Sequence, residues 1–248
     1  MSSCCLGGFK WDGQPQGQEA TLNDQGYYVT GSNSDVALLV IHDLYGWTFP
    51  NIRLLADHFS AEVGATVYVP DFFGGEVLPA DIINNPAEWA KLNLPEFMQR
   101  NSKDVRKPEV KAFAEFLRSR HRRVGAIGYC YGGWAVFQLG AARAGGQPLV
   151  DCISAAHPTF LEKEEIRGVG VPVQIIAPEH DPQFTEELKT YAVTEIPKLG
   201  VPFDYQFFPG LHHGFSVRGN RENKAETKGM ERSMRAAVCW FKEWLAAV

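Results

Sequence analysis

The sequence lacks long hydrophobic runs, an excess of basic residues and a recognisable export signal. No apolar run approaches the roughly 18 residues that spanning a bilayer requires, so we expect no membrane partner. Acidic residues outnumber basic ones by 29 to 24, and the net charge is −5. This balance disfavours a nucleic-acid partner, because phosphate binding needs a basic face. Without a charged and then apolar amino terminus, the chain is predicted to be cytoplasmic.

Cysteine is scarce, with five residues in the chain: Cys4, Cys5, Cys130, Cys152 and Cys239. They form no Cys-x-x-Cys pair, so a zinc site built on cysteines is not expected. In a protein that is not exported the thiols should be reduced. Adjacent Cys4 and Cys5 could form a lipidation or metal position, but we favour two ordinary thiols in a loose terminus. Cys152 falls within an expected strand and should be inert.

Apolar strands alternate with amphipathic helices along the chain, without repeats or linkers. Residues 36–41 (VALLVI) form a continuous apolar run, which is typical of a strand buried on both faces. The alternation continues to a closing helix at about 223–247. This order predicts a single α/β domain over residues 1–248, with a mostly parallel sheet covered by helices on both faces. Residues 1–24 are expected to be an irregular N-terminal segment.

Two further segments have less regular patterns. Residues 74–103 are predicted to form an irregular segment with one or two helices, which we call the excursion. A helix is predicted after it, beginning at Pro108, because the missing N–H of proline is harmless in the first turn. Ligands of parallel α/β sheets bind beyond the carboxyl ends of the strands, so chemistry is sought just after each strand.

Gly128-Tyr129-Cys130-Tyr131-Gly132-Gly133 lies between a strand and a helix and matches the nucleophile-elbow pattern, with Cys in place of Ser. The turn is so tight that side chains at the two flanking glycines would collide with neighbours. Cys130 would also lie at a helix N-terminus, where the dipole favours thiolate. The alternative is a glycine-rich turn with a buried, inert cysteine.

A thiol nucleophile needs a base and an orienting acid, which should follow it in the order acid, then base. Asp181 follows one strand and is preferred as the acid, with Glu179 as the competitor. His213 follows the next strand and is preferred over His212 as the base. A solvated loop acid and a structural histidine are the alternatives.

The first buried strand ends at His42-Asp43-Leu44. The backbone N–H groups of Leu44 and Tyr131 are predicted to hold a developing oxyanion. Asp43 could lie near the thiol, where it would disfavour thiolate or accept the S–H hydrogen bond. A loop acid that caps a backbone N–H explains it equally well.

Five motifs together resemble the dienelactone hydrolase family, also called carboxymethylenebutenolidases: GYCYGG, VIHDLYGW, YVPDFFGG, PEHD and HHGFSVRGN. The resemblance runs over roughly residues 25–247 and implies the α/β-hydrolase fold. It implies Cys130 as the nucleophile, His213 as the base and Asp181 as its partner. It also implies that Asp43 holds the resting thiol. Bacterial members typically have Glu there, and eukaryotic ones resemble this chain in having Asp.

Bacterial members of that family bind a substrate carboxylate with arginines. Arg218 falls in a matching His-Gly-Phe-x-x-Arg pattern and would form a planar, bidentate clamp. Arg100 is a second candidate. A solvated surface position is the alternative for both and is favoured for Arg100.

These observations predict a cysteine hydrolase that opens a lactone or cleaves an activated ester through an acyl-enzyme. Its expected partner is a small-molecule lactone or ester, and no metal or organic cofactor is required. Peptides are a less suitable substrate, since a thiolate displaces basic amines poorly. A thioesterase or carboxylesterase with the same triad is an alternative, and so is a non-catalytic ligand-binding protein of the same fold.

Overall fold

The computed structural model describes residues 5–79, 82–83, 85–89, 91–142 and 146–246. Within these residues, eight strands form one sheet in the order β1-β2-β4-β3-β5-β6-β7-β8. The first two pairings, β1 with β2 and β2 with β4, are antiparallel, and all later pairings are parallel. The strands are β1 (Gln18–Leu22), β2 (Gln25–Thr30), β3 (Val36–Ile41), β4 (Thr66–Pro70), β5 (Arg123–Tyr129), β6 (Cys152–Ala156), β7 (Val173–His180) and β8 (Phe203–His212).

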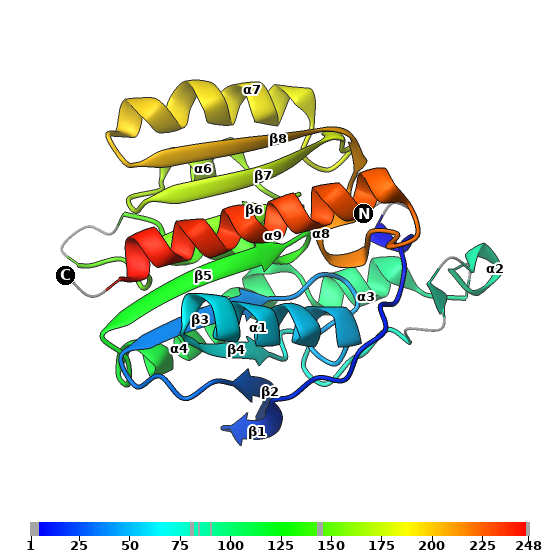
Figure 1. The fold of residues 1–248 in the computed structure, drawn as a ribbon, viewed down its shortest axis with the longest axis horizontal. Helices are drawn as coiled ribbons and strands as arrows, with labels where there is room; N and C mark the ends of the chain where they lie inside the picture. Colours follow the sequence, from blue (N-terminus) through cyan, green and yellow to red (C-terminus); the bar gives the residue numbers. More distant parts are fainter. Residues whose placement is uncertain (1–4, 80–81, 84, 90, 143–145, 247–248) are drawn as a thin grey trace.

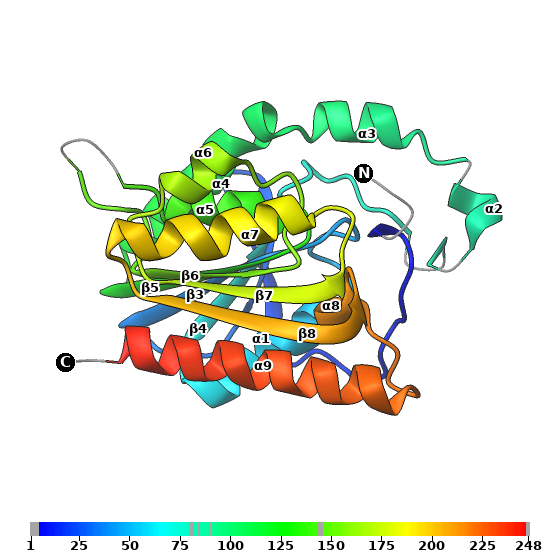
Figure 2. The same ribbon diagram turned by 90° about the horizontal axis from the view of Figure 1, so that it is seen from above.

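Helices cover both faces of this sheet. Figure 2 shows α1 and α9 on one face and α4, α5, α6 and α7 on the other. The helices are α1 (Pro50–Val63), α2 (Pro86–Trp89), α3 (Leu94–Arg100), α4 (Lys103–Arg118), α5 (Gly132–Leu139), α6 (Lys163–Arg167), α7 (Glu186–Glu195), α8 (Phe215–Arg218) and α9 (Lys224–Leu245), with a 3-10 turn at Ile196–Leu199. The predicted fold class is therefore confirmed.

The core lies between the sheet and its helices because the central strands carry apolar side chains on both faces. From Ala37 to Ile41, every residue of β3 is fully buried, and β6 is buried throughout. The long helix α9 presents an apolar stripe to β5 and β6 and leaves its other side in water. Among the described residues, the structure has no helix long and apolar enough to cross a membrane.

The sequence predicts an irregular segment over residues 1–24. This prediction is wrong for the last part of the segment, because Gln18–Leu22 form β1. β1 and β2 are joined by Asn23 and Asp24, which have φ angles of 48° and 67°. Two successive left-handed residues form a turn whose twist suits a hairpin, and Asn and Asp tolerate this conformation better than most residues. The short turn therefore adds an edge hairpin to the sheet.

The helix predicted to begin at Pro108 begins earlier, at Lys103, and Pro108 lies inside it. The core contacts of Val110, Phe113 and Leu117 hold α4 against the sheet, so the helix tolerates the lost hydrogen bond. Before α4, the excursion projects past the carboxyl ends of the strands, where α2 and α3 lie in Figure 1. The loops after β3, β5, β6, β7 and β8 open on this same side.

Candidate active site

Cys130 occupies the sharp turn between β5 and α5. Its φ is 50°, in the left-handed region, and the residue is completely buried. A Cβ on Gly128 would lie 2.1 Å from the carbonyl oxygen of Gly132, and one on Gly132 would lie 2.3 Å from that of Ile41. Both approaches are too close for any side chain. The expected steric role of these glycines is confirmed, and the turn holds the sulfur beyond the strand end.

The ends of β7 and β8 bring Asp181 and His213 together. Nδ1 of His213 lies 2.9 Å from Oδ1 of Asp181, and neither side chain is exposed. The same carboxylate oxygen accepts hydrogen bonds from the backbone N–H groups of Gln183 and Phe184. These bonds orient the carboxylate, which in turn holds the imidazole with Nε2 facing away from it.

The alternative acid and the alternative base, Glu179 and His212, lie outside this pair. Glu179 accepts a hydrogen bond from the N–H of Gly210 and is exposed. His212 is also exposed, and its ring stacks on His180 with centroids 4.8 Å apart. The structure therefore brings together the preferred acid and base, Asp181 and His213.

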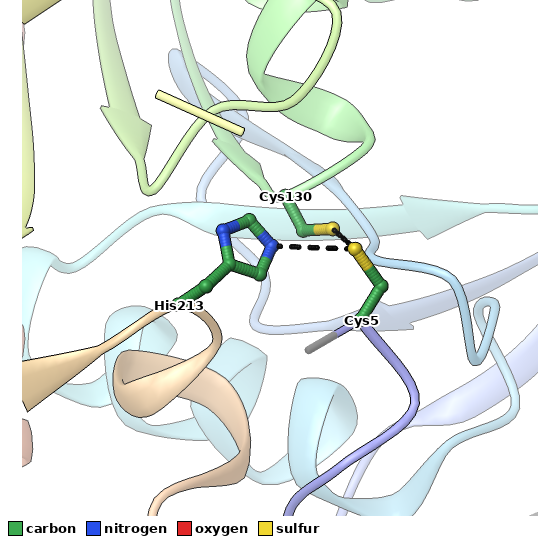
Figure 3. A group of neighbouring side chains, drawn as sticks. All are labelled: Cys5, Cys130 and His213. Atoms are coloured by element: carbon green, nitrogen blue, oxygen red, sulfur yellow. Dashed lines mark hydrogen bonds between the residues drawn. The ribbon is translucent and has the colours of Figure 1, made fainter. Parts of the chain in front are cut away.

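Cys5 lies beside both Cys130 and His213, although it is far from both in the sequence. Its sulfur is 3.7 Å from Nε2 of His213 and 3.9 Å from the sulfur of Cys130 (Figure 3). Cys5 is fully buried. The expectation that it is an ordinary thiol in a loose terminus is wrong, because the N-terminal chain packs over the turn at Cys130. Cys4 lies outside the described residues.

A segment that we call the N-terminal strap, residues 5–11, holds Cys5 in this position. The Leu6 carbonyl accepts a 2.7 Å hydrogen bond from the Tyr45 hydroxyl. Further along, the strap is hydrogen-bonded through Gly7, Phe9 and Trp11 to α1, α8 and the residue after α8. The partners on those elements are Asn51, Arg218 and Gly219.

The site favours a thiolate–imidazolium pair. Burial raises the pKa of Cys130, but the hydrogen bond shared with Cys5, the charge of His213 and that of Arg218 together outweigh it, so the net pKa lies well below the usual value. Burial lowers the pKa of His213, whereas the Cys130 charge and the bond to Asp181 raise it, to about 10. These shifts favour a negative charge on the sulfur of Cys130 and a positive charge on the imidazole of His213.

Asp43 and Arg218 form a fully buried ion pair beside this group. Oδ2 of Asp43 accepts from Nη1 of Arg218, and its Oδ1 accepts from the N–H of Tyr45 at 3.0 Å. Burial raises the pKa of Asp43, and the positive charge of Arg218 lowers it by less, so the net shift is upward. Asp43 thus contacts an arginine and a backbone N–H, and its predicted contact with the resting thiol stays a prediction. The pair occupies Nη1 of Arg218, and the predicted substrate contact of this arginine stays a prediction.

The two predicted oxyanion donors lie on either side of the elbow. Leu44 and Tyr131 are both fully buried. Neither backbone N–H donates a hydrogen bond to any residue that the structure describes. Because such donors are ordinarily paired, two unpaired N–H groups beside the candidate nucleophile are suited to a negatively charged oxygen.

Arg100 lies on α3 and is half exposed. Its guanidinium makes two-pronged hydrogen bonds with Glu76, the shortest at 2.7 Å. The predicted substrate contact of Arg100 stays a prediction. A cavity of about 480 Å³ opens nearby between α3 and the elbow, and Tyr131 and Phe160 contribute to its wall.

Two residues that follow β6 belong to the site and were missed in the sequence. Thr159 has its hydroxyl 3.3 Å from the sulfur of Cys130. His157 stacks edge-on against His213 at 5.0 Å and hydrogen-bonds to Ser216 at 2.7 Å through Nε2. The rule that identified Cys130 and His213, a polar residue just after a strand, applies to both. No comparable signal exists for Cys5.

One group among the described residues has the composition of a metal site. The ligand atoms of Cys5, Cys130 and His213 all lie within 4.8 Å of one another. The same three side chains include the candidate nucleophile and the candidate base.

Comparison with known proteins identifies the family. The family model described as "Dienelactone hydrolase family" matches residues 25–245. The chain belongs to the dienelactone hydrolase family. It is a hydrolase of that family, and the resemblance seen in the sequence is confirmed.

Relatives in the family match nearly the whole chain. A protein named hydrolase pyvD from Aspergillus violaceofuscus is 31% identical over 249 residues, covering 98% of this chain and 97% of its own. A carboxymethylenebutenolidase homolog from Mus musculus is 28% identical, covering 97% and 96%. The crystal structure of a dienelactone hydrolase from Anabaena variabilis shares the fold, with a TM-score of 0.64, 16% identity and coverage of 94% and 99%.

Proposed function

We propose that the protein hydrolyses a lactone or an activated ester through a thioester acyl-enzyme on Cys130. One observation carries the proposal: the sulfur of Cys130 neighbours His213, whose other ring nitrogen is 2.9 Å from Asp181. This is the geometry that nucleophilic catalysis requires, with a nucleophile, a base and a group that orients the base.

Each group has a chemical role in the proposed reaction. The Cys130 thiolate attacks the carbonyl carbon, and the N–H groups of Leu44 and Tyr131 stabilise the oxyanion. The leaving oxygen takes the proton of His213, which leaves an acyl group on sulfur. His213, held by Asp181, then accepts a proton from water as the water attacks the thioester. The thiolate departs and the starting state returns.

The proposed setting is the cytoplasm. The nucleophile must remain a thiol, and thiols persist in reducing compartments. The described cysteines, at positions 5, 130, 152 and 239, are not joined in disulfides. The proposed partner is a small molecule, since the cavity next to the elbow measures about 480 Å³.

The decisive experiment compares Cys130→Ala with wild type on lactones, aryl esters and thioesters. Cys130→Ala should lower kcat by about 1,000-fold or more while leaving the fold intact. Cys152→Ala is the matched control: this buried cysteine is the first residue of β6, away from the elbow turn, and burial raises its pKa far above the usual value. It should keep wild-type turnover.

The panel also separates the alternatives. Near-wild-type turnover by Cys130→Ala would refute the assignment of Cys130 as the nucleophile. Turnover of thioesters or simple aryl esters alone would favour a thioesterase or carboxylesterase, and binding without turnover would favour a ligand-binding protein. A preference for carboxylated lactones that Arg218→Met abolishes would assign the carboxylate contact to Arg218.

A further inference from the structure

Two sulfur atoms from distant parts of the chain meet at the candidate nucleophile. The sulfurs of Cys5 and Cys130 are 3.9 Å apart, and both residues are fully buried. Figure 3 shows Cys5 reaching from the N-terminal strap toward Cys130, with the ring of His213 beside the two sulfurs. The hydrolytic steps above assign no part to Cys5.

The strap keeps Cys5 there by specific contacts. Immediately after Cys5, the Leu6 carbonyl accepts from Tyr45, and the Gly7 carbonyl accepts from Nε of Arg218 at 3.1 Å. Both partners are fully buried, so this part of the strap is anchored in the core of the site. The distance between the sulfurs is thus a property of the fold, and a shift of about 2 Å would bring them to bonding distance.

The surroundings of Cys130 make its sulfur a strong nucleophile. His213 and Arg218 place positive charge near it, and the pKa of Cys130 is well below the usual value despite burial. Thiolates in such surroundings attack peroxide oxygen readily, and the sulfenic acid that forms is captured when a second thiol lies beside it. Cys5 is in that position.

We propose that Cys5 and Cys130 form a reversible disulfide when a hydroperoxide enters the site, which makes the pair a modification site that withdraws the nucleophile. In the first step, the Cys130 thiolate attacks the terminal peroxide oxygen. The S–O bond forms, the O–O bond breaks and the departing alkoxide takes the proton of His213. Cys130 is oxidised by two electrons, and the peroxide is reduced to an alcohol.

In the second step, His213 accepts the proton of Cys5, whose sulfur is 3.7 Å from Nε2. The Cys5 thiolate attacks the Cys130 sulfur, the S–S bond forms and the S–O bond breaks. Hydroxide leaves and takes the proton back from His213 as water. In total, two thiols and one hydroperoxide yield a disulfide, an alcohol and water, and a dithiol reductant restores both thiols.

The remaining thiols allow a selective reaction to be recognised. Cys239 is exposed on α9, and Cys152 is buried within β6. A non-selective oxidation would modify Cys239 first because it is the exposed one. Oxidation through the proposed steps should leave Cys239 and Cys152 as thiols.

The test exposes the reduced, folded protein to a small excess of hydrogen peroxide. A chelator is present so that no cation occupies the two sulfurs and His213. After denaturation and alkylation, the number of titratable thiols should fall by two. A tryptic digest without reductant should contain residues 1–10 joined to residues 124–143, and dithiothreitol should separate them.

Single variants assign the partner. Cys4→Ser is the matched control, since it changes the neighbouring cysteine of the same tryptic peptide, and it should keep the cross-link. Cys5→Ser and Cys5→Ala should both lose it, and Cys130 should proceed to sulfinic acid instead. Circular dichroism of each variant verifies folding.

Three results would overturn the proposal. The first is Cys130 oxidised to sulfinic acid in the wild type while Cys5 stays alkylatable. The second is a cross-link that survives in Cys5→Ser and disappears in Cys4→Ser. The third is no oxidation of Cys130 under conditions that modify Cys239. The cross-link is measured by mass, so its failure is distinct from a failure of the proposed hydrolysis, which the substrate panel measures.

Discussion

At Cys130 the neighbouring groups favour a negative charge in a fully buried position. Burial alone would keep the sulfur protonated, because a charge in a dry interior is costly. The Cys5 thiol, His213 and Arg218 supply the compensation, and Asp43 neutralises Arg218 in turn. The reactivity of the thiol is therefore a property of several neighbours rather than of the cysteine itself.

The first prediction concerns the pH dependence of this pair. The pKa of Cys130 is lowered well below its usual value and that of His213 is raised to about 10, so the thiolate and the protonated imidazole should coexist over a pH range that ends at about pH 10. The alkylation rate of Cys130 by iodoacetamide should change less than about twofold between pH 7 and pH 9. For a small-molecule thiol with a pKa of about 8.5, the alkylation rate should rise about 20-fold from pH 7 to pH 9.

Mass spectrometry of the alkylated peptide gives the rate, and Cys5→Ser provides the comparison. Loss of the Cys5 hydrogen bond should move the acidic limb of the profile toward neutral pH. A Cys130 rate that rises in parallel with the small thiol would show that no ion pair exists.

The second prediction separates the two acids at the end of β7. Asp181→Asn leaves His213 in place but favours the wrong tautomer, so kcat should fall by about 1,000- to 10,000-fold. Glu179→Gln removes only the charge of an exposed side chain that accepts from Gly210, and kcat should change less than about threefold. Steady-state kinetics on the best ester of the panel measures both. The reverse order of effects would reassign the acid.

Single residues differ in how far the sequence predicts them. Cys130, Asp181 and His213 could be found because each directly follows a strand and their chain order matches a known pattern. Cys5 could not, because 208 positions separate it from His213 and no local pattern records that contact. The partner of Arg218 was also missed, since an arginine near a base fits a substrate or a buried carboxylate equally well.

At the scale of elements, the turn from β5 to α5 tolerates little change in sequence. It needs a left-handed Cys130 between two glycines whose side-chain space is filled by backbone atoms. The local sequence therefore predicts the turn closely. The start of α4 was predicted less well, because core contacts hold the helix together although Pro108 cannot donate a backbone hydrogen bond inside it. The β1–β2 hairpin was not predicted, because a two-residue turn is a weak signal in the sequence.

The third prediction tests this turn with Gly132→Ala. The added Cβ would lie 2.3 Å from the Ile41 carbonyl oxygen, so β3 and α5 must separate. Stability should fall by about 3 kcal/mol or more and activity should be lost. Urea unfolding measures the first and ester turnover the second.

Gly168→Ala is the matched control. Gly168 ends α6 with a right-handed φ of −83°, and the nearest atom to its added Cβ is 3.2 Å away. Its unfolding free energy should stay within about 1 kcal/mol of wild type. Equal losses in the two variants would show that the elbow is no tighter than an ordinary helix end.

At the scale of the whole molecule, the N-terminal strap connects the start of the chain to α1, α8 and the residue after α8. Asn51 is the central link and is fully buried. Its amide donates to the carbonyls of Phe9 and Val217 and accepts from the N–H of Trp11, with distances of 2.8–2.9 Å. One side chain thereby fixes the strap relative to the loop that follows His213.

The fourth prediction removes this link with Asn51→Ala. The variant leaves buried carbonyl and N–H groups without partners, so stability should fall by about 2–4 kcal/mol. Hydrogen exchange should accelerate in residues 5–11 and 215–219 together, because both depend on the same amide. Asn33→Ala, which removes bonds to Gly64 and Asp35, should leave exchange in both segments unchanged. Faster exchange in only one of the segments would show that Asn51 does not couple them.

The distance along the chain between the thiol and its base has a consequence for biosynthesis. A ribosome releases the N-terminal part first, so Cys5 and Cys130 emerge while β8 and His213 are still unmade. During that interval Cys130 has neither the imidazole nor Arg218 nearby, and its sulfur behaves as an ordinary thiol. The surroundings that lower the pKa of Cys130 are therefore completed only when the last strand joins the sheet.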